Sequence, residues 1–366
     1  MREPFDLTTL IEPLLNWFKD HARVLPWRNE PTPYRVWVSE IMLQQTRVEA
    51  VKPYFDRFLK ELPDAAALSD CPEEKLLKLW EGLGYYNRVR NMQIAAQTVM
   101  ENYHGELPAD YEALTKLKGI GHYTAGAIAS IAFGIPVPAV DGNVLRVISR
   151  VTEDDADIMK ASVRTAMEKD LLEIMPENRA GAFNQALMEL GATVCLPNGA
   201  PLCEACPWKE VCRAQKSGRW RELPVKSKAK ARRIEDRTVL VIKAEDKVLL
   251  HKRANKGLLA GLYEFPNVEG HLKEEEVITY LKKMGLSPIR LKKLEDSRHI
   301  FSHIEWHMTG YAVQIDETEQ EYQNMLFVDV KETEEQYPIP AAFSRYTGYM
   351  LSLIHISEPT RQAEIS

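Results

Sequence analysis

The chain has 366 residues, of which 45% are hydrophobic and 27% charged, and its formal net charge is -6. This length favours two domains or more, and this composition excludes disorder as a description of the whole chain. No apolar run approaches the roughly 18 residues of a membrane span, and the N-terminus lacks the apolar core of a secretion signal, so we expect a cytoplasmic protein.

Residues 1–213 are predicted to be helical. Amphipathic stretches alternate there with proline and glycine, which end helices and form tight turns. Many short helices of this kind indicate an irregular all-α fold. The helices that the periodicity predicts are Leu7–Asp20, Val36–Leu59, Glu73–Trp80, Arg90–Glu101, Thr124–Phe133 and Ala182–Gly191.

Residues 214–236 are predicted to be a basic linker, because they are polar and show no apolar periodicity. From Arg213 to Arg233 the chain holds nine Lys and Arg residues against the single Glu222. Such a segment either lies along a DNA backbone or acts only as a flexible tether. Local charge therefore permits a nucleic-acid partner although the net charge is negative.

Residues 237–350 are predicted to form an α+β domain. Two β-rich runs, Thr238–Ile242 and Lys247–His251, are joined by Glu245-Asp246 and indicate a hairpin. Further strands are expected at His299–Phe301, Trp306–Val313 and Met325–Val328, with a helix at Lys273–Met284. Residues 351–366 resemble translated cloning sequence, and we exclude them from the prediction of the fold.

Two glycines, Gly119 and Gly121, lie between two predicted helices in the segment Leu117–Ala125. Glycine lets a backbone approach a ligand closely, and the first N–H groups of the following helix have no acceptor within it. The segment is suited to binding a phosphate. An ordinary turn between helices would also explain these glycines.

Two carboxylates occur in settings that allow either a structural or a catalytic role. Asp141, in Pro138–Val144, is expected to cap a helix, which is a common role for Asp before Gly-Asn. Glu40 interrupts an apolar helical stretch that continues to Gln44 and Gln45. On an isolated helix, Glu40 would be a solvated surface residue.

Four of the five cysteines fall within eighteen residues, namely Cys195, Cys203, Cys206 and Cys212. In a reducing compartment such a group is more typical of a metal site than of disulfides. Four thiolates suit either zinc or a [4Fe–4S] cluster, and the ligand type does not decide between them. Cys71 stands apart and is expected to be either a buried thiol or a spare one.

Together with Leu25–Arg28 and Trp80–Tyr86, these segments closely resemble the adenine DNA glycosylase (MutY) family of the endonuclease III, helix-hairpin-helix superfamily. The resemblance runs from about Leu7 to Cys212 and resumes in the second domain. It implies a six-helix part at about 25–135, a cluster part formed by 1–24 and 136–213, and a [4Fe–4S] cluster rather than zinc. The first gap between cysteines is one residue longer than in the family, which a surface loop can absorb.

The resemblance implies a reaction in which two acidic residues have different catalytic roles. Glu40, with its pKa raised by burial, would protonate N7 of adenine, and ionised Asp141 would stabilise the sugar cation. Tyr123 and Asn143 would orient these acids. Tyr123 also replaces the nucleophilic lysine of bifunctional relatives, so the resemblance implies a monofunctional enzyme, with Lys118 the obvious source of any weak lyase activity.

The resemblance also implies how DNA is held. Trp27, Arg28 and Gln185 would line the pocket for the flipped adenine, while Tyr85 and Gln45 would wedge into the stack at the lesion with help from Leu43. Packing in the core is the alternative role for Trp27 and Tyr85. The residues of the hairpin that would contact the DNA backbone are Lys118, Gly119, Gly121 and Thr124.

The segment Lys252–Pro266 resembles the beginning of a Nudix domain. The stretch 267–278 lacks the Arg-Glu and Glu-Glu helix that holds Mg²⁺ in Nudix hydrolases, so we expect a domain that reads DNA rather than cleaves a nucleotide. Phe301, Ser302 and His303 match the segment with which the family recognises 8-oxoguanine. By themselves these three residues are a weak signal.

The resemblance implies a monomeric, monofunctional enzyme that removes adenine opposite 8-oxoguanine or guanine in double-stranded DNA during base excision repair. The resemblance implies a bacterial, nucleoid-associated protein. Three alternatives remain: an endonuclease III-like glycosylase with AP lyase activity, a non-catalytic iron–sulfur DNA-binding protein, and a nucleotide pyrophosphohydrolase.

Overall fold

The computed structural model describes residues 4–227, 231–316 and 324–352. The chain forms two compact units, one made of residues 1–71 and 87–229 and the other of residues 72–86 and 230–366. Residues 72–86, which we expected in the helical region, therefore belong with the second unit. The other predicted boundaries remain predictions, and the predicted non-native tail lies almost entirely outside the described residues.

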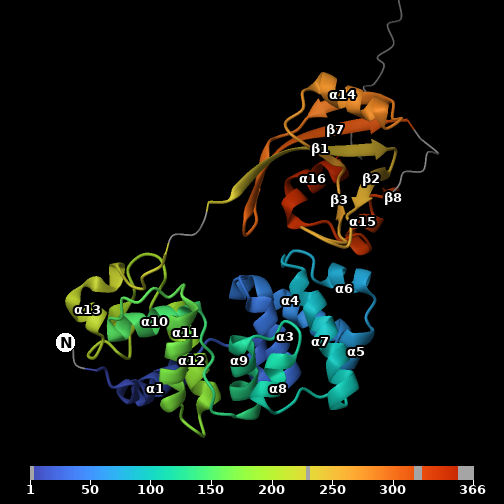
Figure 1. Cartoon of the computed structure of the whole chain (residues 1–366). Helices are drawn as coiled ribbons and strands as arrows, with labels where there is room; N and C mark the ends of the chain where they lie inside the picture. The colour runs from blue at the N-terminus through green and yellow to red at the C-terminus, as the bar shows by residue number, and fades with distance from the viewer. Residues whose placement is uncertain (1–3, 228–230, 317–323, 353–366) are drawn as a thin grey trace, which may run out of the picture. The chain divides into compact units, whose positions relative to one another are not determined.

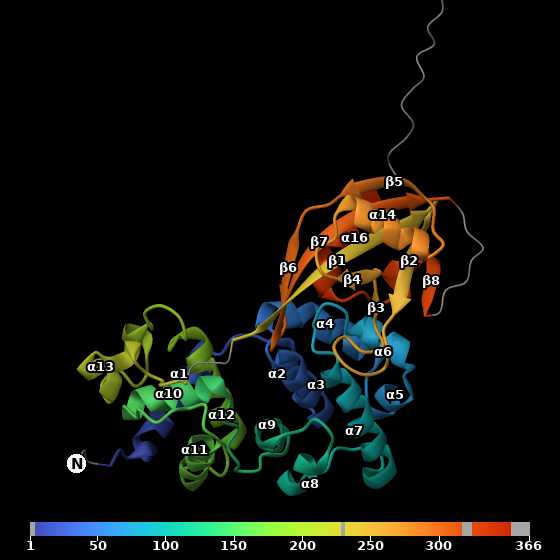
Figure 2. The same ribbon diagram turned by 45° about the horizontal axis from the view of Figure 1, so that its top comes forward.

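The first unit is helical, and its two ends in sequence meet. In Figures 1 and 2, α1 lies beside α10, α11 and α12, which come more than 100 residues later. One apolar core joins them through Leu14, Val147, Leu171 and Leu187. The elements are η1 (Leu7–Leu10), α1 (Ile11–His21), α2 (Pro26–Asn29), α3 (Pro33–Leu43), α4 (Val48–Glu61), α5 (Ala65–Asp70), α7 (Asn87–Tyr103), α8 (Tyr111–Lys116), α9 (His122–Phe133), α10 (Gly142–Thr152), α11 (Ala161–Glu173), α12 (Ala180–Thr193), η2 (Cys203–Ala205), α13 (Arg213–Ser217) and η3 (Arg219–Arg221).

The single helix predicted over Val36–Leu59 is wrong, because the chain forms α3 and α4 with a break between them. The guanidinium of Arg88 donates to the carbonyls of Ile41, Met42 and Gln44 at 2.8, 3.1 and 2.6 Å. These carbonyls lie at the C-terminus of α3, where a helix lacks its own donors. A side chain more than 40 residues away therefore stabilises the break, and no local pattern could reveal it.

Most of the predicted linker is packed against the first unit. Residues 213–221 form α13 and η3, and Leu223 is buried. The carbonyl of Leu223 accepts from Arg150, and that of Val225 accepts from the amide of Ile158. At the other end, strand β1 already begins at Arg233. The sequence showed no periodicity because these residues are held by polar contacts from residues far away in the chain.

The second unit contains a mixed β-sheet of order β3-β2-β1-β7-β5. Its central strands β1 and β7 are parallel and in register from Arg233 opposite Ile304 to Ala244 opposite Ile315. The predicted hairpin at Glu245-Asp246 is confirmed by the antiparallel pair β1 and β2. The strands are β1 (Arg233–Ala244), β2 (Lys247–Lys252), β3 (Tyr263–Glu264), β4 (Asn267–Glu269), β5 (Pro288–Lys293), β6 (Ser297–Ile300), β7 (Ile304–Ile315) and β8 (Met325–Asp329).

Helices cover both faces of this sheet (Figures 1 and 2). Val277 and Leu281 of α14 pack on one face, and Phe343 and Tyr346, from η4 and α16, pack on the other. The unit thus has three layers, and the predicted α+β class is confirmed. Its helices are α6 (Glu73–Leu79), α14 (Glu274–Lys283), α15 (Glu332–Glu335), η4 (Ala341–Phe343) and α16 (Ser344–Ser352).

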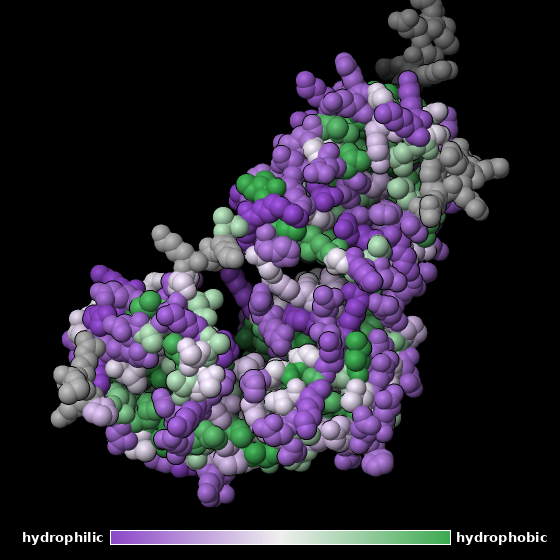
Figure 3. All heavy atoms as spheres, in the orientation of Figure 1, coloured by the Kyte–Doolittle hydropathy of each residue, from purple (hydrophilic) through white to green (hydrophobic). Residues whose placement is uncertain are grey.

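Hydrophilic side chains predominate on the face shown in Figure 3, and the hydrophobic ones are scattered among them. Scattered apolar residues are normal on a folded surface. Within the described residues, no helix combines the length and the apolar character required to cross a membrane.

Candidate active site

A cavity of about 1020 Å³ opens in the first unit between α2, α3, α9, α12 and the start of α10. It brings together residues that are up to 169 positions apart in the sequence, from Arg23 to Ala192. All four expected catalytic residues and all three expected adenine-pocket residues line it, together with Leu43 and Gln45. The lining residues of interest are Trp27, Arg28, Glu40, Leu43, Gln45, Tyr123, Asp141, Asn143, Gln185 and Glu189.

Glu40 lies on α3 and is only 6% exposed. The hydroxyl of Tyr123, on α9, donates to Glu40 Oε2 at 2.5 Å. Burial raises the pKa of Glu40 to about 7, with the hydrogen bond from Tyr123 and the charge of Arg28 opposing the rise and the charge of Asp141 adding to it. Glu40 can therefore hold a proton near neutral pH, which an ordinary surface glutamate cannot.

Asp141 has a different environment because it accepts only from N–H groups. Its Oδ1 accepts from the backbone amide of Val144 at 2.8 Å, and its Oδ2 accepts from Asn143 Nδ2 at 2.7 Å. Burial raises the pKa of Asp141, while these hydrogen bonds and the charge of Arg146 oppose the rise. Asp141 thus caps α10 and also faces the cavity, so the structural and catalytic interpretations are compatible.

A buried arginine, Arg146, connects this acid to the cysteine loop. Its Nη2 donates to Asn143 Oδ1 at 3.0 Å, and its Nε donates to the carbonyl of Cys195 at 3.0 Å. Arg150, one turn later on α10, donates to Cys195 Sγ at 3.3 Å. The sequence analysis missed both arginines, although their spacing of four along α10 places them on one helix face.

A second hydrogen-bond network, which the sequence analysis did not predict, fixes the position of Arg28. Glu189, 1% exposed, accepts from Arg28 Nη2 at 2.8 Å and from Arg23 Nε at 2.6 Å. Arg28 Nε also donates to Gln185 Oε1 at 3.1 Å. Burial raises the pKa of Glu189, but the hydrogen bond from Arg23 and the charge of Arg28 hold it below its usual range. Glu189 follows Gln185 by four residues, which was the available signal.

The two glycines form a tight turn before the N-terminus of α9. Gly119 has φ +80°, and a Cβ there would lie 2.8 Å from Asn91 Cβ. Gly121 precedes α9, whose first amides belong to His122, Tyr123 and Thr124. The side chain of Thr124 is buried, so only its backbone could reach DNA, and Lys118 is exposed and does not line the cavity.

Two residues expected at the lesion have left-handed backbones. Gln45 has φ +58° in the first unit, and Tyr85 has φ +47° in the second. Non-glycine residues adopt this conformation at a cost, and such strain clusters at functional sites. Tyr85 is 48% exposed, so it is not a core aromatic. Trp27 is buried against Phe55 and also lines the cavity.

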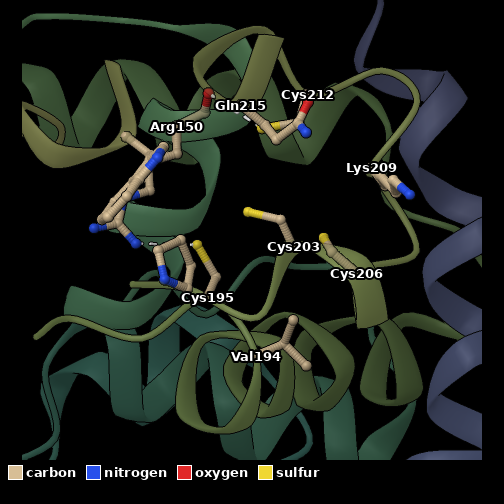
Figure 4. A pocket seen from close by; sticks show the side chains of 10 residues that line it. Arg150, Val194, Cys195, Cys203, Cys206, Lys209, Cys212 and Gln215 are labelled. Carbon is tan, nitrogen blue, oxygen red and sulfur yellow. Dashed lines mark hydrogen bonds between the residues drawn. The ribbon is translucent and has the colours of Figure 1, made fainter. Parts of the chain in front are cut away.

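The four clustered cysteines surround one pocket, shown in Figure 4. Its lining also includes Gln215 and Trp220, so part of the predicted linker belongs to this site. Within the described residues, no group of three or more His, Cys, Asp or Glu side chains is arranged to hold a single metal ion. Four thiols around a shared space could hold either a zinc ion or a [4Fe–4S] cluster.

In the second unit, Phe301, Ser302 and His303 form the tight turn between β6 and β7, in which the amide of Phe301 donates to the carbonyl of Ile304 at 2.8 Å. Phe301 packs edge-on against His299 and Trp306, and Ser302 and His303 are exposed.

The three glutamates that begin α14 are exposed, and Glu276 accepts from the amide of Lys273 as a helix cap. A capping and solvated role accounts for them.

Comparison with known proteins first defines the class of protein to which this chain belongs. Residues 38–173 match the HhH-GPD superfamily of base excision DNA repair proteins, and residues 237–347 match the NUDIX domain. A solved non-covalent complex of endonuclease III with DNA superposes with a TM-score of 0.50 at 26% identity, covering 60% of this chain and 100% of that one. The chain thus combines a helix-hairpin-helix glycosylase fold with a Nudix-like domain.

Two curated relatives narrow this class. An adenine DNA glycosylase of Buchnera aphidicola is 34% identical over 304 residues, covering 81% of this chain and 84% of the relative. The adenine DNA glycosylase of Mus musculus is 36% identical over 370 residues, covering 85% of this chain and 72% of the relative. The chain belongs to the adenine DNA glycosylase family.

Proposed function

We propose that this chain is a monofunctional DNA glycosylase that removes adenine paired with 8-oxoguanine or guanine. The observation that carries the proposal is the pair of buried acids, Glu40 and Asp141, which line one cavity in unlike environments. A cavity of about 1020 Å³ has room for a base swung out of the duplex. Membership of the family supplies the choice of adenine.

The two acids perform complementary steps. Glu40, protonated near neutral pH, donates its proton to N7 of the flipped adenine and so makes the base a better leaving group. Asp141, held by the N–H donors of Val144 and Asn143, stabilises the positive charge that develops on the sugar. Water then completes the hydrolysis. Tyr123 fixes the orientation of Glu40, and Glu189 fixes that of Arg28.

The identity of residue 123 argues against lyase chemistry. A Schiff base requires a lysine amine at the sugar carbon, whereas the side chain at this point of the cavity is Tyr123. Lys118 is exposed in the turn and does not line the cavity. Incubation of the enzyme and damaged duplex with borohydride should therefore give no covalent adduct at yields matching turnover.

For the cysteine pocket we propose a [4Fe–4S] cluster held by Cys195, Cys203, Cys206 and Cys212. The four thiols around one pocket, and the resemblance of this segment to the cluster loop of the family, support the cluster over zinc. The cluster would supply structural cohesion to the loop after α12. Analysis of iron, inorganic sulfide and zinc in the purified protein distinguishes the two.

DNA binding is assigned to separate surfaces. The turn at Gly119–Gly121 and the amides that begin α9 would bind a backbone phosphate. Gln45, Leu43 and Tyr85 would prop the stack, and Phe301, Ser302 and His303 would recognise 8-oxoguanine. The strain at Gln45 and Tyr85 and the exposure of Ser302 and His303 support this assignment.

The test is a duplex that contains one A:8-oxoguanine pair. Single-turnover excision followed by alkali should cut only the adenine strand, and only after alkali. Scission without alkali would support the bifunctional alternative. Binding without excision would support a non-catalytic DNA-binding protein.

A further inference from the structure

Helix α6 and the turn after it belong to the same compact unit as the β-sheet, although their residues fall within the HhH-GPD match. This turn leads to Tyr85, which is exposed and has a left-handed backbone. The unit also carries the Phe301–His303 turn. Two of the segments that the proposed function puts at the damaged base pair, Tyr85 and the Phe301–His303 turn, are therefore parts of one compact unit.

Two side chains near the end of α6 join it to the segment Thr333–Ile339. Lys78 Nζ donates to the carbonyl of Thr333 at 2.9 Å and to that of Tyr337 at 3.5 Å. Glu81 Oε1 accepts from the amide of Ile339 at 2.7 Å, and Glu81 pairs with Lys78 at 2.6 Å. The side chains of Lys78 and Glu81 are only 16% and 29% exposed, so these contacts are partly shielded from water.

The backbone between Glu81 and Tyr85 is tightly held. Buried Trp80 donates from Nε1 to the carbonyl of Gly84 at 3.1 Å, and the amide of Leu83 donates to the carbonyl of Trp80 at 3.1 Å. These two bonds close the turn that links Glu81 to Tyr85, so a shift of Glu81 is passed on to Tyr85.

We propose that Lys78 and Glu81 are positioning residues for lesion recognition. They fix the Tyr85 turn to the segment Thr333–Ile339, so that Tyr85 and the Phe301–His303 turn engage the damaged pair in a fixed relation. The consequence is a preference for adenine opposite 8-oxoguanine over adenine opposite guanine. This inference rests on the proposed function. It adds Lys78 and Glu81, which do not line the adenine pocket and are not among the proposed DNA contacts, to the residues that determine recognition.

The same helix offers a matched control. Glu74 pairs with Lys252 at 2.7 Å and also joins α6 to the sheet, but its side chain is 62% exposed. An exposed pair of this kind contributes little to a fixed geometry. Glu74→Gln should therefore leave recognition unchanged.

The experiment measures single-turnover excision from A:8-oxoguanine and A:G duplexes with the full-length enzyme. Glu81→Ala leaves the amide of Ile339 without its acceptor, and we expect the ratio of the two rates to fall about tenfold. Glu81→Gln keeps an acceptor oxygen, so the ratio of the two rates should fall less in this variant. Lys78→Met should resemble Glu81→Ala, and thermal unfolding confirms that each variant is folded.

The outcomes separate this inference from the function on which it rests. Equal loss of both rates in Glu81→Ala, an unchanged ratio, or the same loss in Glu74→Gln would overturn the positioning role while leaving the glycosylase intact. A wild-type enzyme that excises adenine equally from both duplexes would contradict the proposed recognition of 8-oxoguanine, and the inference would fall with it.

Discussion

Glu40 is an acid that the fold has removed almost entirely from water, and its proton is the reagent of the proposed reaction. Because the protonated form is the active one and its pKa is about 7, the excision rate should be high below pH 7 and fall as pH rises above it. Tyr123→Phe removes a hydrogen bond that lowers the pKa of Glu40. In this variant, the fall of the excision rate with rising pH should therefore begin at a higher pH than in the wild type. Single-turnover rates across pH check this, and an unchanged pH dependence would contradict the assignment.

The same burial has a consequence for stability. A carboxyl whose pKa is raised on folding binds more protons in the folded state, so it costs stability as pH rises from about 4.5 to about 7. Glu40→Gln should therefore stabilise the protein at pH 8 by up to about 3 kcal/mol and change little at pH 4. Urea unfolding of both proteins at the two pH values measures this difference. A variant that is less stable than wild type at pH 8 would show that Glu40 is not destabilised by burial.

At the scale of the element, the end of α3 depends on a residue of α7. Arg88 donates to three carbonyls there, so Arg88→Met should destabilise the first unit by about 2 kcal/mol. Lys52→Met, which breaks an exposed pair with Glu49, should cost less than about 0.5 kcal/mol. Denaturant unfolding gives both values. Equal losses of stability in the two variants would show that the hydrogen bonds of Arg88 to the end of α3 do not stabilise the first unit.

The limits of sequence-based prediction follow from the same contacts. Periodicity and turn residues predicted α9, α14 and the β1–β2 hairpin, because each is determined by local pattern. The break after α3 and the packed segment 213–227 depend on Arg88 and Arg150, which lie far away in sequence. Resemblance to a family supplied the acids, whereas Glu189 and Arg146 had no motif and emerged only from the hydrogen bonds that they make.

At the scale of the whole molecule, a net charge of -6 coexists with a site for a polyanion. The proposed DNA contacts depend on local features, above all the turn at Gly119–Gly121 and the amides that begin α9. Affinity for a duplex should therefore fall linearly with the logarithm of salt concentration, with a slope that reports the phosphates contacted. Fluorescence anisotropy measures this slope. Affinity that does not respond to salt would exclude backbone contacts as its source.

The central claim is that Glu40 and Asp141 act together on one flipped adenine. The most direct measurement compares single-turnover excision from an A:8-oxoguanine duplex by the wild type and by Glu40→Gln, with DNA affinity measured on the same duplex. The account predicts that Glu40→Gln binds the duplex normally but loses at least about 100-fold in rate. Normal excision by Glu40→Gln would contradict the account.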